Sequence, residues 1–131
     1  MTAYYLLLLH LLGDYVLQSD WMAQEKTKAW WPAFLHALTY TIPFTLLFGF
    51  QWEPLVLIGG THFAIDHWRL ARYVCWAKNF PAPKAYRYSW TECFSTGYPQ
   101  AMPAWLSVWL LIITDNAMHL ALNGLAWHLW G

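Results

Sequence analysis

The chain has 131 residues, of which 59% are apolar, 20% aromatic and 11% charged. An ordinary soluble domain carries roughly a quarter charged residues, so this composition leaves too few polar side chains to cover a soluble surface. Seven basic residues balance seven acidic ones, which gives no electrostatic reason to expect nucleic acid or an acidic partner. The composition predicts a single integral-membrane domain over residues 1–131, with the lipid bilayer as its surroundings.

Four apolar stretches of near-membrane length follow one another along the chain. They are residues 3–18, 29–50, 54–76 and 103–130. A helix needs roughly 20 apolar residues to cross the hydrocarbon core, so the predicted fold is all-α, a four-span transmembrane helical bundle. No basic segment or small-residue cleavage site marks the first stretch as a signal peptide, and we expect it to belong to the mature fold. Pro43 lies inside the second stretch and is expected to kink it.

All seven basic residues fall on one side of this topology. Lys26 and Lys28 lie in the first connection, and the other five lie at the end of the third stretch and in the third connection: Arg69, Arg72, Lys78, Lys84 and Arg87. Cytoplasmic loops of membrane proteins carry an excess of Lys and Arg. We therefore expect these connections to be cytoplasmic and both termini to lie on the non-cytoplasmic side.

The third connection, residues 77–101, is long and unusually aromatic. Ser89 and Glu92 have the spacing of a capping box, which predicts a short helix starting there. Two interpretations of the connection stay open. It is either a loop that rests on the lipid headgroups or a lid over a site that faces the cytoplasm, because long loops in compact proteins are often functional.

Three of the four stretches carry a histidine and an aspartate four residues apart, and the remaining stretch carries one histidine. The residues are His10 and Asp14, His36, His62 and Asp66, and Asp115 and His119. Residues four apart occupy one face of a helix. Each pair therefore presents an imidazole and a carboxylate on the same side of its helix.

An ionisable side chain at the centre of a bilayer costs on the order of 2.5–3.5 kcal/mol on insertion scales, so these carboxylates need a partner. A divalent metal suits a mixed His and Asp set. We predict zinc, with manganese or iron as alternatives, bound by His10, Asp14, His36, His62, Asp66, Asp115 and His119. Asp14 and Asp66 are also predicted to be catalytic, with one carboxylate free to activate a water molecule. A purely structural polar network and a metal-free proton relay are the alternatives.

Five further polar residues are weaker candidates. Gln18, Asn116 and Asn123 lie near the His/Asp faces, with ordinary helix contacts as their alternative role. His67 points about 100° away from Asp66 by helix geometry. His128 lies near the end of the chain and is expected to take no part in a site.

The run His10-Leu-Leu-Gly-Asp-Tyr-Val-Leu-Gln18, followed by Asp20-Trp-Met-Ala23, resembles the opening signature of an uncharacterised membrane-protein family, domain of unknown function 3307. His36, the run His62-Phe-Ala-Ile-Asp66 and the run Asp115-Asn-Ala-Met-His119 are similar to later parts of its pattern, in which Gln usually stands in place of Asn116. The aromatic third connection is similar to a variant in tailed bacteriophages. The resemblance implies a protein of the bacterial inner membrane and no particular activity. By residue type alone, the His-x₃-Asp pattern is also similar to bacterial membrane proteins described as metal-dependent hydrolases.

Three functional hypotheses follow. The first is a membrane-embedded metal-dependent hydrolase that acts on a lipid or lipid-linked phosphate, with Arg69 and Arg72 either holding the phosphate or anchoring the chain at the interface. The second is a non-enzymatic phage membrane factor that modifies the host envelope or binds a host membrane protein, with a structural His/Asp cluster. The third is ion or proton translocation, for which four short spans would have to assemble as a homo-oligomer.

Overall fold

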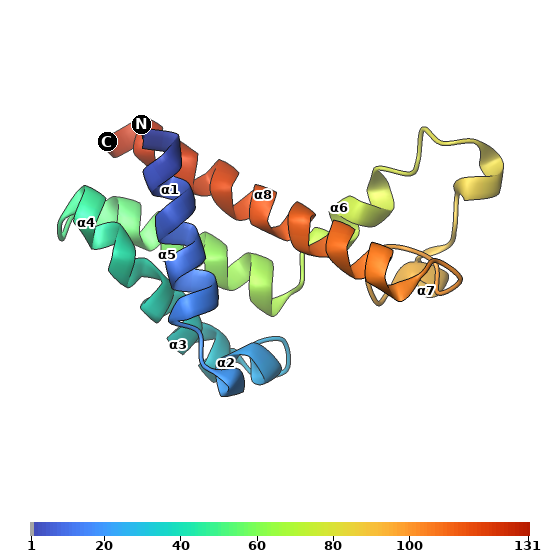
Figure 1. The fold of residues 1–131 in the computed structure, drawn as a ribbon, viewed down its shortest axis with the longest axis horizontal. Helices are drawn as coiled ribbons and strands as arrows, with labels where there is room; N and C mark the ends of the chain where they lie inside the picture. Colours follow the sequence, from blue (N-terminus) through green and yellow to red (C-terminus); the bar gives the residue numbers. More distant parts are fainter. Residues whose placement is uncertain (1) are drawn as a thin grey trace. The chain divides into compact units, whose positions relative to one another are not determined.

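The computed structural model describes residues 2–131, and over this range the secondary structure is entirely helical. The expectation of an all-α chain is therefore confirmed. The described residues up to Trp68 form one compact unit together with His119–Gly131, and Arg69–Met118 form a second unit. The ribbon is shown in Figure 1.

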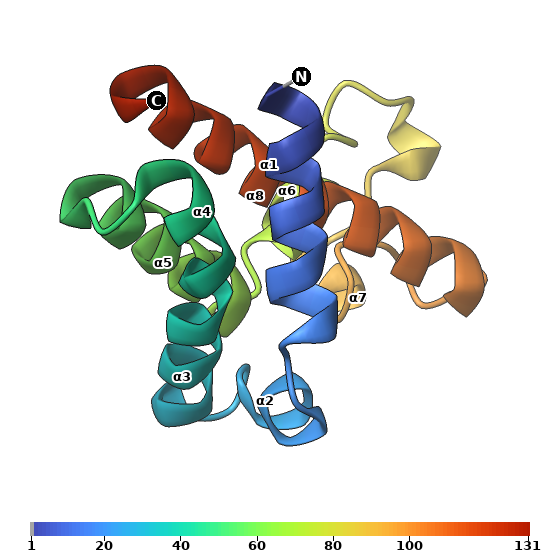
Figure 2. The same ribbon diagram turned by 60° about the vertical axis from the view of Figure 1, so that its left-hand side comes forward.

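The first unit begins with α1 (Thr2–Leu11), which widens into a π-helical turn over Leu12–Val16. After a short connection, α2 (Asp20–Glu25) starts at Ser19, whose hydroxyl accepts a hydrogen bond from the Met22 N–H at 3.3 Å. A serine in this position satisfies one of the unpaired N–H groups at a helix start. Figure 2 shows α2 lying beside the ends of α1 and α3.

Helix α3 (Trp30–Thr41) gives way to a 3₁₀ turn over Ile42–Phe44 and then to α4 (Thr45–Phe48). The change falls at Pro43, where the sequence predicted an irregularity, because proline has no N–H for the helical ladder. Gly49 follows α4 with a φ of 60°, a conformation that glycine adopts at little cost.

Helix α5 (Trp52–His67) returns alongside α3 in the opposite direction (Figures 1 and 2). The two helices bury aromatic and aliphatic side chains against α1 and the last part of α8. The core residues are Leu6, Leu9, Tyr40, Phe44, Phe48, Ile58 and Ala126. This packing holds α1, α3 and α5 together and so positions the polar residues of their inward faces.

The third predicted span, residues 54–76, is interrupted. Helix α5 ends at His67, and Arg69 has a φ of 53°, which is uncommon for a residue with a side chain. A new helix, α6 (Ala71–Ala77), starts after this break and belongs to the second unit.

The second unit also contains a 3₁₀ turn (Lys84–Tyr86), α7 (Trp90–Cys93) and the first part of α8 (Ala104–Trp130). The predicted capping box is confirmed, since both of its hydrogen bonds between Ser89 and Glu92 are present. These bonds from the Ser89 hydroxyl and N–H hold the pKa of the Glu92 carboxyl below its usual value.

The two arginines considered as phosphate ligands hold this unit together. The guanidinium of Arg69 donates to the Ser95 carbonyl at 2.7 Å, and that of Arg72 donates to the Phe94 carbonyl at 2.9 Å. Both side chains thus fix the segment that follows α7.

By length and apolar composition, one helix of the described residues could cross a membrane, and it is α8. This is one span, whereas the sequence predicted four. The other candidates are shorter because the π turn, Pro43 and the break before Arg69 divide them. Large apolar side chains nonetheless face outwards on the other helices, among them Val16 (70% exposed) and Leu46 (78% exposed).

Candidate metal centre

Four side chains from three segments of the first unit converge in its interior, and we call them the His/Asp centre. Asp14 comes from the π turn, His36 from α3, and His62 and Asp66 from one face of α5. All four residues are buried, and one ligand atom from each lies within 4.8 Å of the others. The structure therefore brings together residues that are up to 52 positions apart in the sequence.

The ligand atoms of the His/Asp centre are spaced as they would be around a small cation. Nε2 of His36 lies 3.1 Å from Oδ1 of Asp14 and 3.2 Å from Oδ2 of Asp66. Nε2 of His62 lies 3.2 Å from the same Asp66 oxygen, 2.9 Å from Nε2 of His36 and 3.8 Å from Oδ1 of Asp14. A tetrahedral ion with bonds of about 2.0–2.1 Å places its ligand atoms about 3.3 Å apart. The arrangement has the dimensions of a four-coordinate site.

The chemistry of the donor set also fits a divalent ion. Two Nε2 atoms face each other, and within such a pair only one nitrogen can donate a hydrogen to the other. A metal would instead accept a lone pair from each imidazole and each carboxylate, which is a set suited to zinc, manganese or iron. One feature of most metal sites is missing from the described residues: Nδ1 of His36 and Nδ1 of His62 have no hydrogen-bond partner.

Lys26 places a positive charge at the edge of the His/Asp centre. Its Nζ lies 2.6 Å from Oδ2 of Asp66, 3.8 Å from Oδ1 of Asp14 and 3.3 Å from Nε2 of His36. The Lys26 side chain is 18% exposed, whereas the Asp66 side chain is 3% exposed. The lysine therefore supplies counter-charge from the more open side of the cluster.

The backbone of Lys26 is fixed from two directions. Its N–H donates to the Met22 carbonyl at the end of α2, and its own carbonyl lies 2.9 Å from Nδ1 of His67. A carbonyl only accepts hydrogen bonds, so Nδ1 of His67 carries the proton in this contact. His67, a weak candidate for the site itself, thus contacts the backbone of the residue that carries the ammonium group.

Two more of the predicted histidines lie around the His/Asp centre. Nε2 of His119 lies 3.2 Å from Oδ1 of Asp66, on the side of the carboxylate away from Lys26, and Nε2 of His10 lies 4.0 Å from Oδ2 of Asp14. Both histidines are buried. Asp115 belongs to the second unit, so its assignment as a ligand stays a prediction.

Tyr40 joins the outer histidines to the core, a role that the sequence analysis missed. Its hydroxyl lies 2.8 Å from Nδ1 of His10 and accepts a hydrogen bond from Nδ2 of Asn123 at 2.7 Å. Its ring stacks on the ring of His62, with 3.6 Å between centroids. The signal was present in the sequence, because Tyr40 follows His36 by four residues and Asn123 follows His119 by four.

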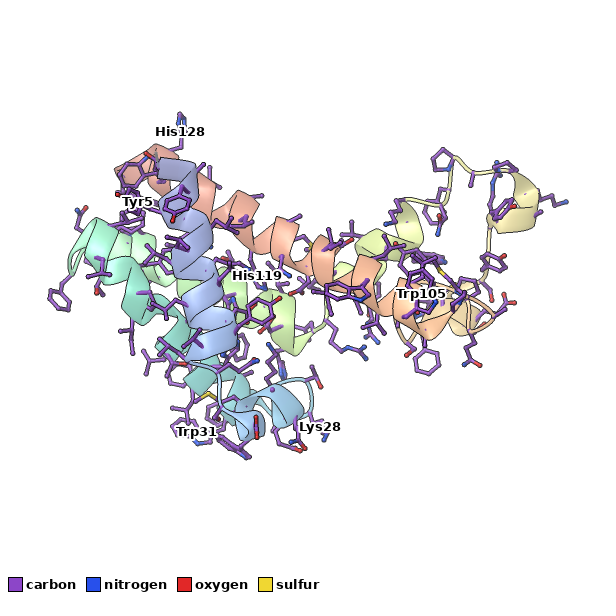
Figure 3. The ribbon with its side chains drawn as sticks, in the orientation of Figure 1. Tyr5, Lys28, Trp31, Trp105, His119 and His128 are labelled. Atoms are coloured by element: carbon purple, nitrogen blue, oxygen red, sulfur yellow. The ribbon has the colours of Figure 1, made fainter. Side chains whose placement is uncertain are left out.

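The remaining histidine of the chain lies away from this cluster. His128 is exposed near the end of α8, well away from His119 in Figure 3. Its position agrees with the expectation that it takes no part in the site.

These observations define an all-helical protein whose first unit contains a buried His/Asp centre with a lysine counter-charge. The family described as "Protein of unknown function (DUF3307)" matches residues 3–88, about two thirds of the chain, and the chain belongs to this family. The matched range includes the whole His/Asp centre and Lys26, and it ends before Asp115 and His119. Neither a curated protein nor a solved structure matches the chain.

Proposed function

We propose that this protein is a membrane-embedded metal-binding protein that holds one divalent ion, zinc in first place, at the His/Asp centre and uses it to hydrolyse a lipid or lipid-linked phosphate. The observation that carries the metal site is the spacing of its ligand atoms, at 2.9–3.8 Å. Two imidazoles and two carboxylates at these distances meet the needs of a four-coordinate ion better than they satisfy one another.

The residues around the centre have separate tasks in this proposal. His36, His62, Asp14 and Asp66 would hold the ion, which when bound polarises the oxygen of a phosphoryl or acyl group. His119 fixes the orientation of the Asp66 carboxylate through Oδ1. Lys26 is partly exposed at the open side, where its ammonium can pair with the negative charge of a phosphate.

The membrane part of the proposal is supported by the outer surface. Helix α8 is long and apolar enough to cross a bilayer. Exposed apolar side chains such as Leu46 and Val56 (63% exposed) would be costly in water and are suited to lipid. The resemblance to phage and bacterial membrane proteins leads us to propose the bacterial inner membrane as the location.

The test is metal analysis of protein purified in detergent without chelators or a metal-affinity tag. We expect about one zinc, manganese or iron ion for each wild-type chain, and loss of that ion in Asp14→Asn and Asp66→Asn. Asp20→Asn is the matched control, because Asp20 is exposed on α2 and should leave the metal content unchanged. A wild-type protein without metal, even after incubation with zinc, would contradict the proposal.

The contact between Lys26 and Asp66 favours a second candidate. A lysine 2.6 Å from a buried carboxylate can neutralise the cluster without a metal, as a structural network would require. The protein would then be a non-enzymatic membrane factor, as in the phage hypothesis. In that case neither the wild type nor any of the three variants would bind metal, and the metal-dependent proposal would be abandoned.

A further inference from the structure

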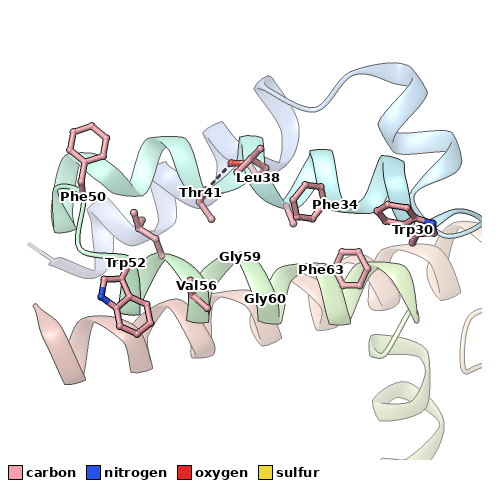
Figure 4. Close-up of a pocket in the computed structure, with 12 residues that line it drawn as sticks. Trp30, Phe34, Leu38, Thr41, Phe50, Trp52, Val56, Gly59, Gly60 and Phe63 are labelled. Atoms are coloured by element: carbon pink, nitrogen blue, oxygen red, sulfur yellow. Dashed lines mark hydrogen bonds between the residues drawn. The ribbon is translucent and has the colours of Figure 1, made fainter.

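Helices α3 and α5 leave an apolar groove of about 560 Å³ on the side of the pair away from the His/Asp centre (Figure 4). Leu38 and Gly60, which line it, are each two residues from the histidine of their own helix. Two residues correspond to about 200° around a helix. The groove and the His/Asp centre therefore lie on opposite faces of the same two helices.

The lining of the groove offers almost nothing to a polar ligand. No charged side chain of the described residues lines it. The hydroxyl of Thr41 donates to the Leu38 carbonyl at 2.7 Å, the bond drawn in Figure 4, so this group is already satisfied within α3. The volume is in the range of small-molecule sites, roughly 300–1,000 Å³, and the chemistry is that of a hydrocarbon.

The length of the groove matches a lipid chain. From Trp52 to Phe63 along α5 the groove extends about 16 Å, at 1.5 Å per residue. The hydrocarbon core of a bilayer is about 30 Å thick, so one leaflet contributes about half of that. An extended acyl chain of a membrane lipid would therefore fill the groove from end to end.

The two ends of the groove differ in charge. Phe63, at one end, stacks on the ring of His67 with 5.3 Å between centroids, and His67 in turn contacts the Lys26 backbone. Lys28 follows two residues later with its side chain 65% exposed. The other end, near Phe50 and Trp52, has no basic residue among its lining. An amphiphile with an anionic head fits this polarity, with its head at the Lys28 end.

We propose that the α3/α5 groove binds the hydrocarbon chain of an anionic lipid, with the headgroup beside Lys28. This inference deepens the proposed function, because it gives a lipid substrate a place for its chain, but binding in the groove does not require a metal.

Gly60 allows a direct test of the groove. A Cβ built at Gly60 meets no atom within 4 Å, and the same is true at Gly124 in α8, which does not line the groove. A leucine at position 60 can thus fill the groove without displacing the helices, and Gly124→Leu is its matched control. Val56→Trp fills the groove from an exposed position and serves as a second variant if Gly60→Leu does not fold.

The experiment uses the full chain in nanodiscs that contain phosphatidylglycerol with a diazirine at mid-chain. After irradiation we expect adducts concentrated on α3 and α5, and a several-fold lower yield there in Gly60→Leu or Val56→Trp but not in Gly124→Leu. A diazirine phosphatidylcholine should label these helices several-fold less than the anionic lipid. Equal labelling of wild type and groove variants, equal labelling by the two lipids, or crosslinks to a second chain in place of lipid would overturn the inference. Metal content is measured in the same samples, so loss of the metal proposal and loss of the groove proposal are separate results.

Discussion

The ammonium nitrogen of Lys26 lies 2.6 Å from Oδ2 of Asp66, the same oxygen that Nε2 of His36 and Nε2 of His62 approach to 3.2 Å. A bound metal would use this oxygen as a ligand. The lysine and a metal are therefore alternative partners for one carboxylate, and binding of the ion would move the ammonium away. This relationship leads to the first prediction.

Replacing Lys26 by methionine should destabilise the metal-free protein by about 3 kcal/mol, the lower end for breaking a buried ion pair, because the lysine is partly exposed. Added zinc should then raise the unfolding temperature more in Lys26→Met than in the wild type, since the metal meets no competing charge. Thermal unfolding in detergent with and without zinc measures both effects.

The control for this prediction is Lys28→Met. Lys28 pairs with Glu25 at 2.8 Å on the surface and is 65% exposed, so its loss should cost less than about 1 kcal/mol. A Lys26→Met protein that is destabilised and gains no more from zinc than the wild type would show that the lysine is a permanent part of a structural network.

Changing His119 to glutamine should weaken metal binding without abolishing it. His119 contacts the outer oxygen of Asp66 at 3.2 Å, and loss of such a supporting contact typically lowers metal affinity about 10–100-fold. Competition with a chelating dye measures the change. His128→Gln is the matched control and should bind as the wild type does, because His128 is exposed near the end of α8. Equal affinities for the two variants would exclude His119 from the site.

Removing the hydroxyl of Tyr40 should cost stability. Tyr40→Phe keeps the ring on His62 but removes the contacts to His10 and Asn123. Buried polar groups that lose a partner typically cost about 1–3 kcal/mol. Denaturant unfolding measures this loss. Tyr5→Phe, at a position 47% exposed, should stay within about 0.5 kcal/mol of the wild type. A neutral Tyr40→Phe would mean that the bridge carries no net stabilisation.

Glycine is required at position 13 because the π turn passes close to α3. A Cβ at Gly13 would lie 2.7 Å from Cδ2 of Tyr40 and 3.0 Å from the Tyr40 carbonyl oxygen. Gly13→Ala should therefore destabilise the protein by about 1–3 kcal/mol through overpacking. Gly124→Ala, where nothing lies within 4 Å, should instead stabilise α8 by about 0.5–1 kcal/mol. Thermal unfolding of the two variants side by side decides the point, and equal effects would refute the close approach.

Periodicity along the chain was sufficient to find the polar faces of the helices. His62 and Asp66 share one face of α5 as their spacing predicts, and both point into the His/Asp centre. The capping box at Ser89 and the irregularity at Pro43 were also accessible, since each depends on a few neighbouring residues. The third span failed for a local reason of another kind, because the positive φ at Arg69 has no glycine or proline to announce it.

The sequence by itself determined which groups are available: a helical chain, and histidines and aspartates placed four apart so that each helix offers them on one face. Only the tertiary structure decided that Lys26 reaches Asp66 and that Tyr40 joins His10 to Asn123. The physical reason is that helical periodicity is a property of one segment. The return of the α2 connection over the end of α5, and the meeting of three helix faces, depend on packing between segments that are distant in the chain.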